Sequence, residues 1–213
     1  MRPCAAAVVA AALATGCVHR SAPCSSPGSC GPGLICSAGR CTHPGVDPVA
    51  SDSDRIVVAA SDIAVVSSRG AALPDEIALA GGAAPVVLLR FPAPWGNRAR
   101  IAAAFLTLEV QDDSGSSGTW TMSVARVLEP WSADVVSWGR LPRLSAPVVT
   151  AEMTSRPSRS LRIDVTPIVE RWAQGQPDEH GMALWVRSAA TSAPTYATGA
   201  LGAAGPRLDV YMR

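Results

Sequence analysis

Four closely spaced cysteines carry the most distinctive chemistry in this sequence. They are Cys24, Cys30, Cys36 and Cys41, spaced C-x5-C-x5-C-x4-C among Gly, Ser and Pro residues. Thiols in this arrangement can form disulfides or hold zinc, but the C-x2-4-C spacing usual in structural zinc sites is absent here. A stretch this short cannot build a hydrophobic core, and crosslinks must therefore hold it together. The pattern predicts two disulfides, for which three pairings are possible.

Other residues with reactive side chains are not arranged for catalysis. His180 lies in the run Asp178–Gly181, where adjacent side chains cannot all converge on one metal, and we interpret this run as a solvated turn. The run Asp112–Gly115 places a serine after two aspartates, but no strand–turn–helix pattern surrounds it, which favours a flexible hairpin loop. The sequence also has no glycine-rich phosphate loop. We therefore expect no catalytic residue, no metal site and no cofactor.

A short apolar run at the amino terminus predicts export. Arg2 supplies a positive start, and Ala5–Ala14 is an uninterrupted run of small apolar residues. A helix needs about 20 residues to span a bilayer, whereas a secretory apolar region takes about 7–15. We therefore interpret residues 1–16 as a signal peptide. No second stretch is long and apolar enough to be a transmembrane helix.

The segment LATGC, residues 13–17, resembles the lipobox of bacterial lipoproteins, with Ala14 where that motif usually has Leu. In that family the cysteine is lipidated, the preceding peptide is removed and the new amino terminus is acylated. The resemblance implies that Cys17 is the lipid attachment site and that residues 17–23 form a lipidated tether. Several acyl chains anchor stably where a single chain holds only marginally. Val18, in place of Asp, implies the outer membrane, while the alternative is an ordinary signal followed by an unmodified cysteine.

The cysteine-rich stretch, residues 24–41, resembles small EGF-like and dickkopf-like modules. This resemblance implies the pairing Cys24–Cys36 with Cys30–Cys41. We interpret the module as a stapled spacer. Residues 42–54 contain Pro, Asp and Ser with little to bury, and they are predicted to be a linker.

Residues 55–213 have the pattern of an all-β domain. Short runs with strand character recur between turn clusters, which predicts a β-sandwich or barrel. One stretch departs from this pattern: Thr166–Gly175 has Thr as N-cap, Pro at the first helical position and Gly at its end, and it predicts one short helix. The ten predicted strands are Ile56–Ala60, Ile63–Val66, Ile77–Ala80, Val86–Phe91, Ile101–Val110, Thr119–Leu128, Val148–Met153, Leu161–Val165, Met182–Val186 and Leu208–Met212.

Several motifs of this domain resemble DNRLRE-type domains, which are related to alginate-binding carbohydrate modules of family 96. The resemblance covers roughly residues 62–212 and implies a jelly-roll-like β-sandwich with one short helix, here preceded by the disulfide-stapled module. Where some relatives seem to hold calcium, residues 66–70 contain no carboxylate. The matching segments are Leu89–Pro92, Ile101–Val110, Trp131 with Trp138 and Pro142, Asp164-Val165-Thr166 with Val169, Trp172, Gly175, Gly181 and Leu184, and Pro206–Tyr211.

Six tryptophans are candidates for stacking on sugar rings. Four match structural motif positions or lie in an apolar strand, and we expect them to be buried or half-buried: Trp131, Trp138, Trp172 and Trp185. Trp95 lies in a loop where the chain bends, and Trp120 follows a Gly/Ser-rich loop. We expect these two rings to be exposed. Exposed aromatic rings can pack against the apolar face of a sugar, so Trp95 and Trp120 are the candidate glycan-binding residues.

Two classes of function remain after these steps. The first is an exported, lipid-anchored, non-catalytic protein whose sandwich binds a glycan or another envelope component. The second is a surface protein that makes protein–protein contacts or builds the envelope without binding glycan, and an unrecognised hydrolase is a less favoured third. The net charge of +1 gives no electrostatic reason to expect nucleic acid as a partner. The expected partners are the membrane, through acyl chains on Cys17, and a polysaccharide or envelope protein.

Overall fold

The computed structural model describes part of the chain in detail: residues 30, 34–37, 40–42, 54–68, 70–72, 76–79, 85–94, 100–112, 119–154, 160–175, 180–187, 195–198 and 205–212. Each of the ten predicted strands overlaps an observed strand. The observed elements are β1 (Ile35–Ser37), β2 (Arg40–Thr42), β3 (Asp54–Ala59), β4 (Asp62–Ser67), β5 (Gly70–Ala72), β6 (Glu76–Ala78), β7 (Val86–Arg90), β8 (Ile101–Asp112), β9 (Thr119–Arg126), β10 (Val149–Thr154), β11 (Ser160–Asp164), α1 (Thr166–Ala173), β12 (Met182–Arg187), β13 (Thr195–Ala197) and β14 (Arg207–Met212).

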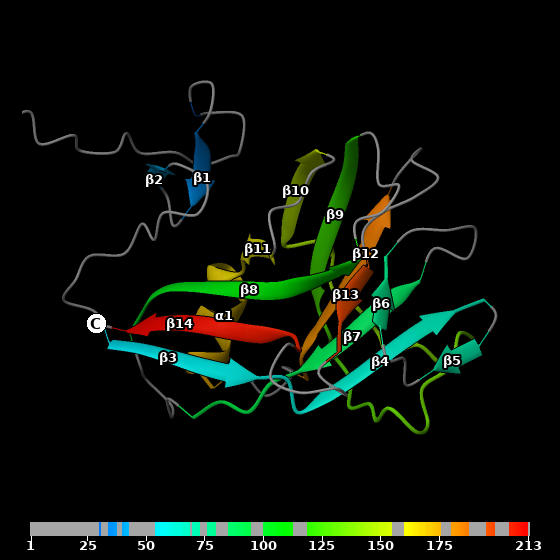
Figure 1. Cartoon of the computed structure of the whole chain (residues 1–213). Coiled ribbons are helices and arrows are strands. Elements are labelled where there is room, and N and C mark those ends of the chain that lie inside the picture. Colours follow the sequence, from blue (N-terminus) through cyan, green and yellow to red (C-terminus); the bar gives the residue numbers. More distant parts are fainter. Residues whose placement is uncertain are drawn as a thin grey trace, which may run out of the picture.

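Two antiparallel sheets form the body of the fold. The first sheet has the order β10-β9-β12-β7-β4-β5, and the second has the order β3-β14-β8-β13-β6, with β11 paired to β8. Strands β3, β14 and β8 run side by side in Figure 1. Consecutive strands β7, β8 and β9 alternate between the sheets, so the chain crosses the sandwich twice in this region. Over the residues that the structure describes, the expected all-β, jelly-roll-like sandwich with one short helix is confirmed.

The main core lies between the two sheets and follows the period-2 alternation of the strands. Every second residue of β8 points inward, and the residues between them face outward. Burying a large apolar side chain stabilises the fold by about 1.5–3 kcal/mol. Fully buried members of this core include Leu106 and Leu108 from the second sheet, and Leu89, Met122 and Leu184 from the first.

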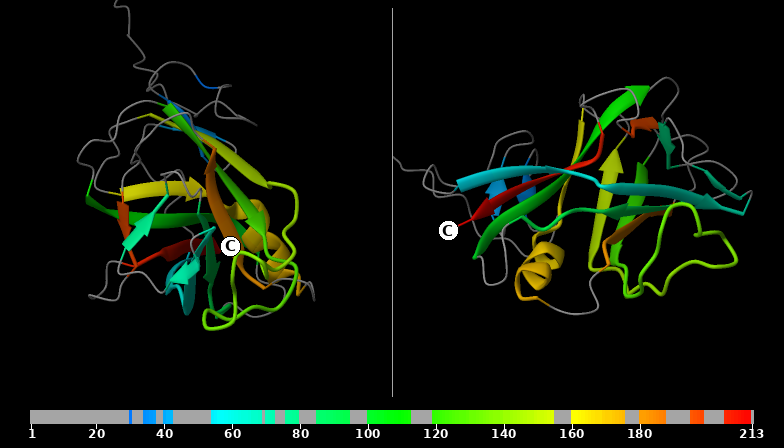
Figure 2. Two further views of the ribbon diagram at one scale, coloured as in Figure 1. Left: turned by 90° about the vertical axis from the view of Figure 1, so that its right-hand side faces the viewer. Right: turned by 90° about the horizontal axis from the view of Figure 1, so that it is seen from below.

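Helix α1 adds to the same core through Ile168 and Val169, and Ala173 of the helix is also buried. Figure 2 shows the helix beside the first half of β8. Proline near the first turn is confirmed, and Gly175 follows the helix at φ 68° with its N–H donating to the Trp172 carbonyl at 3.0 Å. These are the start and stop signals that the sequence predicts.

The predicted N-cap role of Thr166 is wrong. Thr166 is the first helical residue, and the N-cap is Val165, whose side chain makes no capping hydrogen bond. The Thr166 hydroxyl instead accepts a hydrogen bond from the Ala104 N–H of β8 at 2.9 Å and donates to Asp164 Oδ1 at 2.6 Å. The Thr166 N–H also donates to Asp164 Oδ1, at 3.0 Å. Asp164 and Thr166 therefore attach the start of the helix to β8. This role could not be predicted locally, because β8 is distant in the sequence.

The cysteine-rich stretch contains a small hairpin, in which β1 pairs with β2 and Cys36 lies opposite Cys41. A disulfide joins Cys30 to Cys41, as predicted. Cys24 lies outside the described residues, so the Cys24–Cys36 bridge stays a prediction. Cys17, the signal peptide and the tether also lie outside the described residues.

Gly181, at the start of β12, is held in a conformation that only glycine adopts readily. Its φ is 121°, and a Cβ atom added there would overlap the carbonyl oxygen of Leu89 in β7. The Gly181 carbonyl accepts a hydrogen bond from the Val127 N–H at 3.0 Å, just after β9. A side chain at this position would therefore push apart three neighbouring segments of the first sheet.

We expect Gly181→Ala to lower the free energy of unfolding by about 2–4 kcal/mol, because backbone strain and steric overlap act together. Gly139→Ala is the matched control, since Gly139 has no positive φ and an added Cβ would meet nothing within 4 Å. It should change the free energy of unfolding by less than about 0.5 kcal/mol. Urea unfolding of both variants measures the difference, and equal stabilities would contradict the close contact with β7.

Candidate functional site

The long connection between β9 and β10, residues 127–148, is the most elaborate loop in the described part of the chain, and we call it the β9–β10 loop. A two-stranded stem closes it. Val127 pairs with Leu144, and the Leu128 N–H donates to the Arg143 carbonyl at 2.9 Å. The loop therefore has its own hydrogen-bonded framework.

The loop covers the outer face of the first sheet. Ala64, Leu88, Ala183 and Ala125 lie opposite one another on β4, β7, β12 and β9, and all four are buried. Three of these four residues are alanines, whose small side chains let another segment approach the sheet closely. A second hydrophobic cluster forms here between this face and the loop. Its buried members are Ala64, Val66, Leu88 and Ala183 from the sheet, with Val127, Trp131 and Val136 from the loop.

Trp131 is the anchor of this second cluster. Its ring is 8% exposed, and its Nε1–H donates to the His180 carbonyl at 2.8 Å. The guanidinium carbon of Arg90, at the end of β7, lies 4.8 Å from the ring centroid, and the same guanidinium donates to the Trp131 carbonyl. Arg90 also pairs with Asp62 Oδ2 at 3.3 Å. Trp131 is thus held by Arg90 over the ring face, by the His180 carbonyl at the ring nitrogen, and by Arg90 at its own backbone carbonyl.

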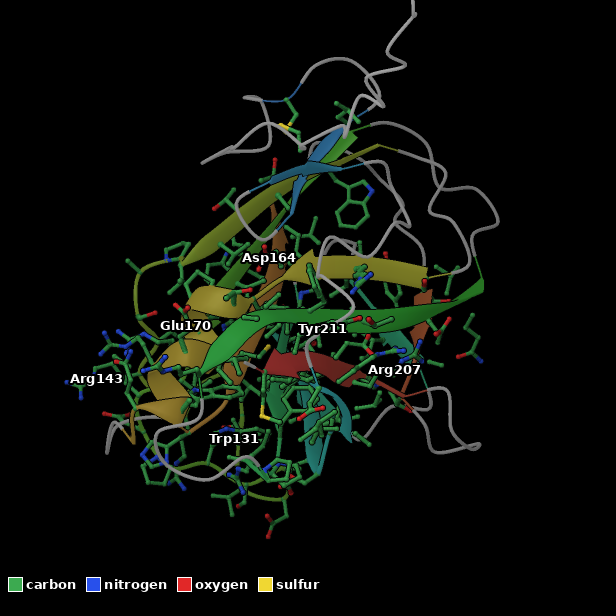
Figure 3. The ribbon with its side chains drawn as sticks, turned by 90° about the vertical axis from the view of Figure 1, so that its left-hand side faces the viewer. Trp131, Arg143, Asp164, Glu170, Arg207 and Tyr211 are labelled. Carbon is green, nitrogen blue, oxygen red and sulfur yellow. A yellow bond between two sulfur atoms is a disulfide. The ribbon has the colours of Figure 1, made fainter. Side chains whose placement is uncertain are left out.

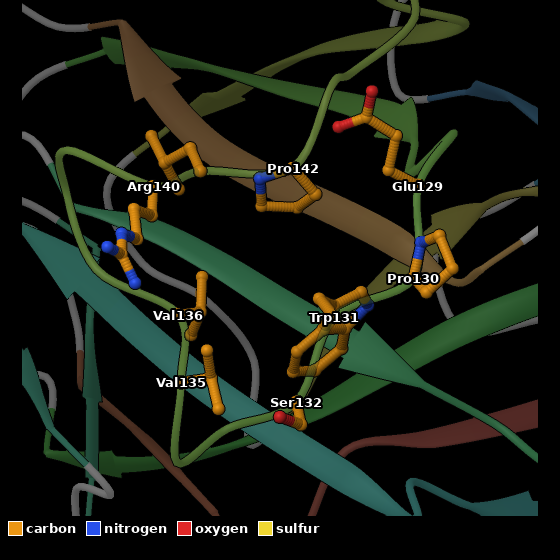
Figure 4. A pocket seen from close by; sticks show the side chains of 9 residues that line it. Glu129, Pro130, Trp131, Ser132, Val135, Val136, Arg140 and Pro142 are labelled. Atoms are coloured by element: carbon orange, nitrogen blue, oxygen red, sulfur yellow. The ribbon is translucent and has the colours of Figure 1, made fainter.

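A hollow of about 530 Å³ opens on the outer side of the loop (Figure 4). Its walls combine apolar and polar surface, with Arg140 and Glu129 on opposite sides. Glu129 is engaged, because Oε2 accepts the Arg143 N–H at 2.9 Å and Oε1 lies 3.7 Å from Arg143 Nε. Within the described residues, no ion pair or side-chain hydrogen bond is observed for Arg140. The remaining lining residues are Pro130, Trp131, Ser132, Val135, Val136, Leu141 and Pro142.

Polar interactions also fix the segment between Trp131 and Trp138. The Ser132 carbonyl accepts hydrogen bonds from the N–H groups of Val135 at 3.2 Å and Val136 at 3.0 Å. A hydrogen bond from the Ser132 side chain lowers the pKa of the Asp134 carboxyl below its ordinary value. Asp134 is therefore a charged, exposed member of a tight turn beside the hollow.

Trp138 is exposed, contrary to the prediction that it would be buried or half-buried. It is 45% exposed and lies at the tip of a tight turn, where Ser137 pairs with Arg140 and the Arg140 N–H donates to the Ser137 carbonyl at 2.9 Å. A ring at a turn tip has no neighbouring element to cover it. Val135, on the same loop, is 60% exposed. The loop thus presents an aromatic and an aliphatic side chain to solvent, and of these two Val135 lines the hollow.

Trp120 is buried, and the prediction that it would be exposed is wrong. Its ring is 2% exposed and belongs to the main core, because Trp120, Met122 and Val124 alternate toward the inside of the sandwich. A ring in this position cannot offer its face to a sugar. Trp95 lies outside the described residues, so its role stays a prediction. The other motif rings behave as expected: Trp131 is buried, and Trp172 and Trp185 are half-buried.

On the outer face of the second sheet, Asp209 is engaged by two neighbouring side chains. Asp209 accepts hydrogen bonds from Arg55 Nη2 at 2.5 Å and from the Thr107 hydroxyl at 3.0 Å. Beside them, Phe105 and Tyr211 pack edge to face with centroids 6.1 Å apart. Figure 3 shows Tyr211 and Arg207 along β14, apart from Trp131 and Arg143 of the β9–β10 loop. Asp209, Arg55 and Thr107 are therefore engaged with one another on this face.

Among the described residues, no group of three or more His, Cys, Asp or Glu side chains is placed to hold a metal ion. His180 contributes its backbone to the fold, since its N–H donates to the Val127 carbonyl at 2.9 Å and its carbonyl accepts the Trp131 Nε1–H. In the same part of the chain, no helix is long and apolar enough to cross a membrane.

Comparisons with protein-family models and with curated proteins find no match for this chain. Among the motif residues of the sequence, Trp131, Asp164 and Thr166 make structural contacts.

We expect Trp131→Ala and Trp138→Ala to affect stability very differently. Removing the Trp131 ring leaves a cavity under the β9–β10 loop and should lower the free energy of unfolding by about 3–5 kcal/mol. Removing the exposed Trp138 ring should change it by less than about 0.5 kcal/mol. Chemical denaturation of the two variants measures this contrast. A large loss of stability in Trp138→Ala would show that its ring is packed and would remove it as a site residue.

Proposed function

We propose that this protein is an exported, lipid-anchored, non-catalytic surface protein whose β-sandwich binds a glycan through Trp138 and the hollow on the same loop. The observation that carries the proposal is the exposed indole of Trp138 on a loop whose base is packed and hydrogen-bonded. A sugar ring has an apolar face, and a flat aromatic side chain covers it at little cost in conformational entropy. The ring is most effective when its support is rigid, because less freedom is then lost on binding.

The surroundings of Trp138 suit a polyhydroxylated ligand. Arg140 lines the hollow and can donate hydrogen bonds, while the Ser132 hydroxyl oxygen and the Glu129 carboxylate can accept them. A volume of about 530 Å³ lies within the range of about 300–1,000 Å³ typical of small-molecule sites. The open shape favours part of a chain over a fully enclosed small molecule.

The resemblance to DNRLRE-type domains supports the same proposal, because it implies a relationship to carbohydrate-binding modules. The sequence assigned glycan contact to Trp95 and Trp120, and the burial of Trp120 moves the proposed contact to Trp138. A protein–protein contact is the second candidate function. Val135 is 60% exposed next to Trp138, and exposed apolar side chains of this kind also mark protein interfaces.

The proposed anchoring rests on the lipobox-like segment at residues 13–17. Lipidation of Cys17, followed by acylation of the new amino terminus, would supply more than one chain, as stable attachment requires. The cysteine-rich module and the linker would then separate the sandwich from the membrane surface. Val18 after the cysteine favours the outer membrane.

For glycan binding, we expect Trp138→Ala to weaken the affinity for a bound polysaccharide by at least about tenfold, or about 1.4 kcal/mol. The measurement is a titration of the chain carrying Cys17→Ser against neutral polysaccharides and against uronic-acid polymers such as alginate. Val57→Ala is the matched control, since Val57 is an exposed apolar residue of β3 in the other sheet. Absence of binding to every glycan, or unchanged affinity in Trp138→Ala, would contradict the proposal and favour the protein-contact alternative.

For anchoring, we expect Cys17→Ser to move the protein from the membrane fraction to the soluble fraction, because the hydroxyl cannot take the lipid. Cell fractionation followed by immunoblotting measures the distribution. Cys41→Ser is the control, since it removes a cysteine of the disulfide module and leaves the lipobox-like segment intact. A Cys17→Ser variant that remains as membrane-bound as the unmodified chain would rule out the lipid anchor.

A further inference from the structure

We infer that Arg90 is the positioning residue of the proposed glycan site, an inference that depends on the proposed function. Arg90 is the last residue of β7, and its side chain is 35% exposed. It lies on the sheet, whereas the exposed ring of Trp138 and the hollow belong to the β9–β10 loop. Any influence of Arg90 on the ligand must therefore pass through its contacts with the loop.

Those contacts converge on Trp131, which lines the hollow. The guanidinium lies over the indole, with its carbon 4.8 Å from the ring centroid, and Nη2 donates to the Trp131 carbonyl. The same side chain therefore fixes both the ring and the backbone of Trp131, close to the start of the loop.

Asp62 and Ser61 hold Arg90 in turn. Nη1 of Arg90 lies 3.3 Å from Asp62 Oδ2, and the Ser61 hydroxyl donates to the same oxygen at 3.3 Å. The Ser61 N–H donates to the Arg90 carbonyl at 2.8 Å. The guanidinium is thus fixed to the junction of β4 and β7. Through its contacts with Trp131, it fixes the start of the loop relative to the sheet.

Only arginine can make this set of contacts. Its planar guanidinium can stack on a ring while donating in its own plane to a carbonyl and a carboxylate. A lysine ammonium is a point charge and cannot stack in this way. A methionine keeps an unbranched apolar stem but donates no hydrogen bond.

Loss of Arg90 should loosen the loop without unfolding the sandwich. The stem between Leu128 and Arg143 remains, and so do the apolar contacts of the second cluster. The Trp131 Nε1–H still reaches the His180 carbonyl. What is lost is the fixed position of the Trp131 backbone, and a ligand must then order the loop before it binds.

The first test uses amide hydrogen exchange on the full chain, with Arg90→Met and Arg90→Lys. In both variants the amides of Val135, Val136 and Arg140 should exchange on the order of tenfold faster, because their hydrogen bonds lie within the released segment. Arg207→Met is the matched control. Arg207 is also a strand residue in an ion pair, 2.7 Å from Glu109 and 30% exposed, but it lies in the second sheet. Unchanged exchange of the three amides in Arg90→Met would overturn the inference whether or not a glycan binds.

The second test is a double-mutant cycle with the polysaccharide identified by titration. Arg90→Met should weaken binding by about tenfold in the unmodified chain and by much less in the Trp138→Ala background, because positioning matters only while the ring is present. Arg90→Lys should restore little of the affinity, whereas a purely electrostatic role would allow a full rescue. Additive effects of the two substitutions, or full affinity in Arg90→Lys, would overturn the inference. Failure of the unmodified chain to bind any glycan would refute the proposed function, and amide exchange would then decide the role of Arg90 on its own.

Discussion

Leu88 and Ala183 lie on the outer face of the first sheet, where a two-layer sandwich would leave them in water, and the β9–β10 loop buries them. The neighbouring residues Leu89 and Leu184 point into the main core, so both faces of this sheet are apolar. A sheet of this kind needs a cover on each side, since exposed apolar surface costs about 25 cal/mol per Å². The path of the loop, the burial of Trp131 and the shape of the hollow all depend on this requirement.

The packing of the β9–β10 loop on the first sheet also explains why the exposed side of this loop is held in one conformation. A connection of this length would ordinarily be mobile, because it buries little and makes few backbone hydrogen bonds. Here the inner side of the loop packs on the sheet through Trp131 and Val136, and its stem is hydrogen-bonded. Contacts on the inner side stabilise the loop. The outer side can therefore carry the exposed side chains of Trp138 and Val135.

The polar side chains described on the two outer faces of the sandwich differ in their interaction partners. On the second sheet, Asp209, Arg55 and Thr107 satisfy one another, and Arg162 lies 3.9 Å from the centroid of the Phe105 ring. On the β9–β10 loop, Arg140 lines a hollow without an ion pair among the described residues, while Glu129 on the other side is held by Arg143. The first arrangement stabilises a fold, and the second leaves a cationic group available to a ligand. The proposed site therefore lies on the loop.

The sequence determined those features that depend on local order. Period-2 alternation located β8 and β9, the Thr-Pro start and Gly175 end located α1, and close cysteine spacing indicated the disulfide-stapled stretch that contains Cys30–Cys41. Strands β5 and β13, each three residues long, were not predicted. Only the tertiary structure decided which rings are covered. Alternation places Trp120, Met122 and Val124 on one face of a strand, but whether another sheet or water lies over that face depends on residues far away in the chain. The same holds for Trp138, whose exposure follows from the turn that carries it away from the sheet, and for Arg90, which meets Trp131 only because the loop folds back over β7.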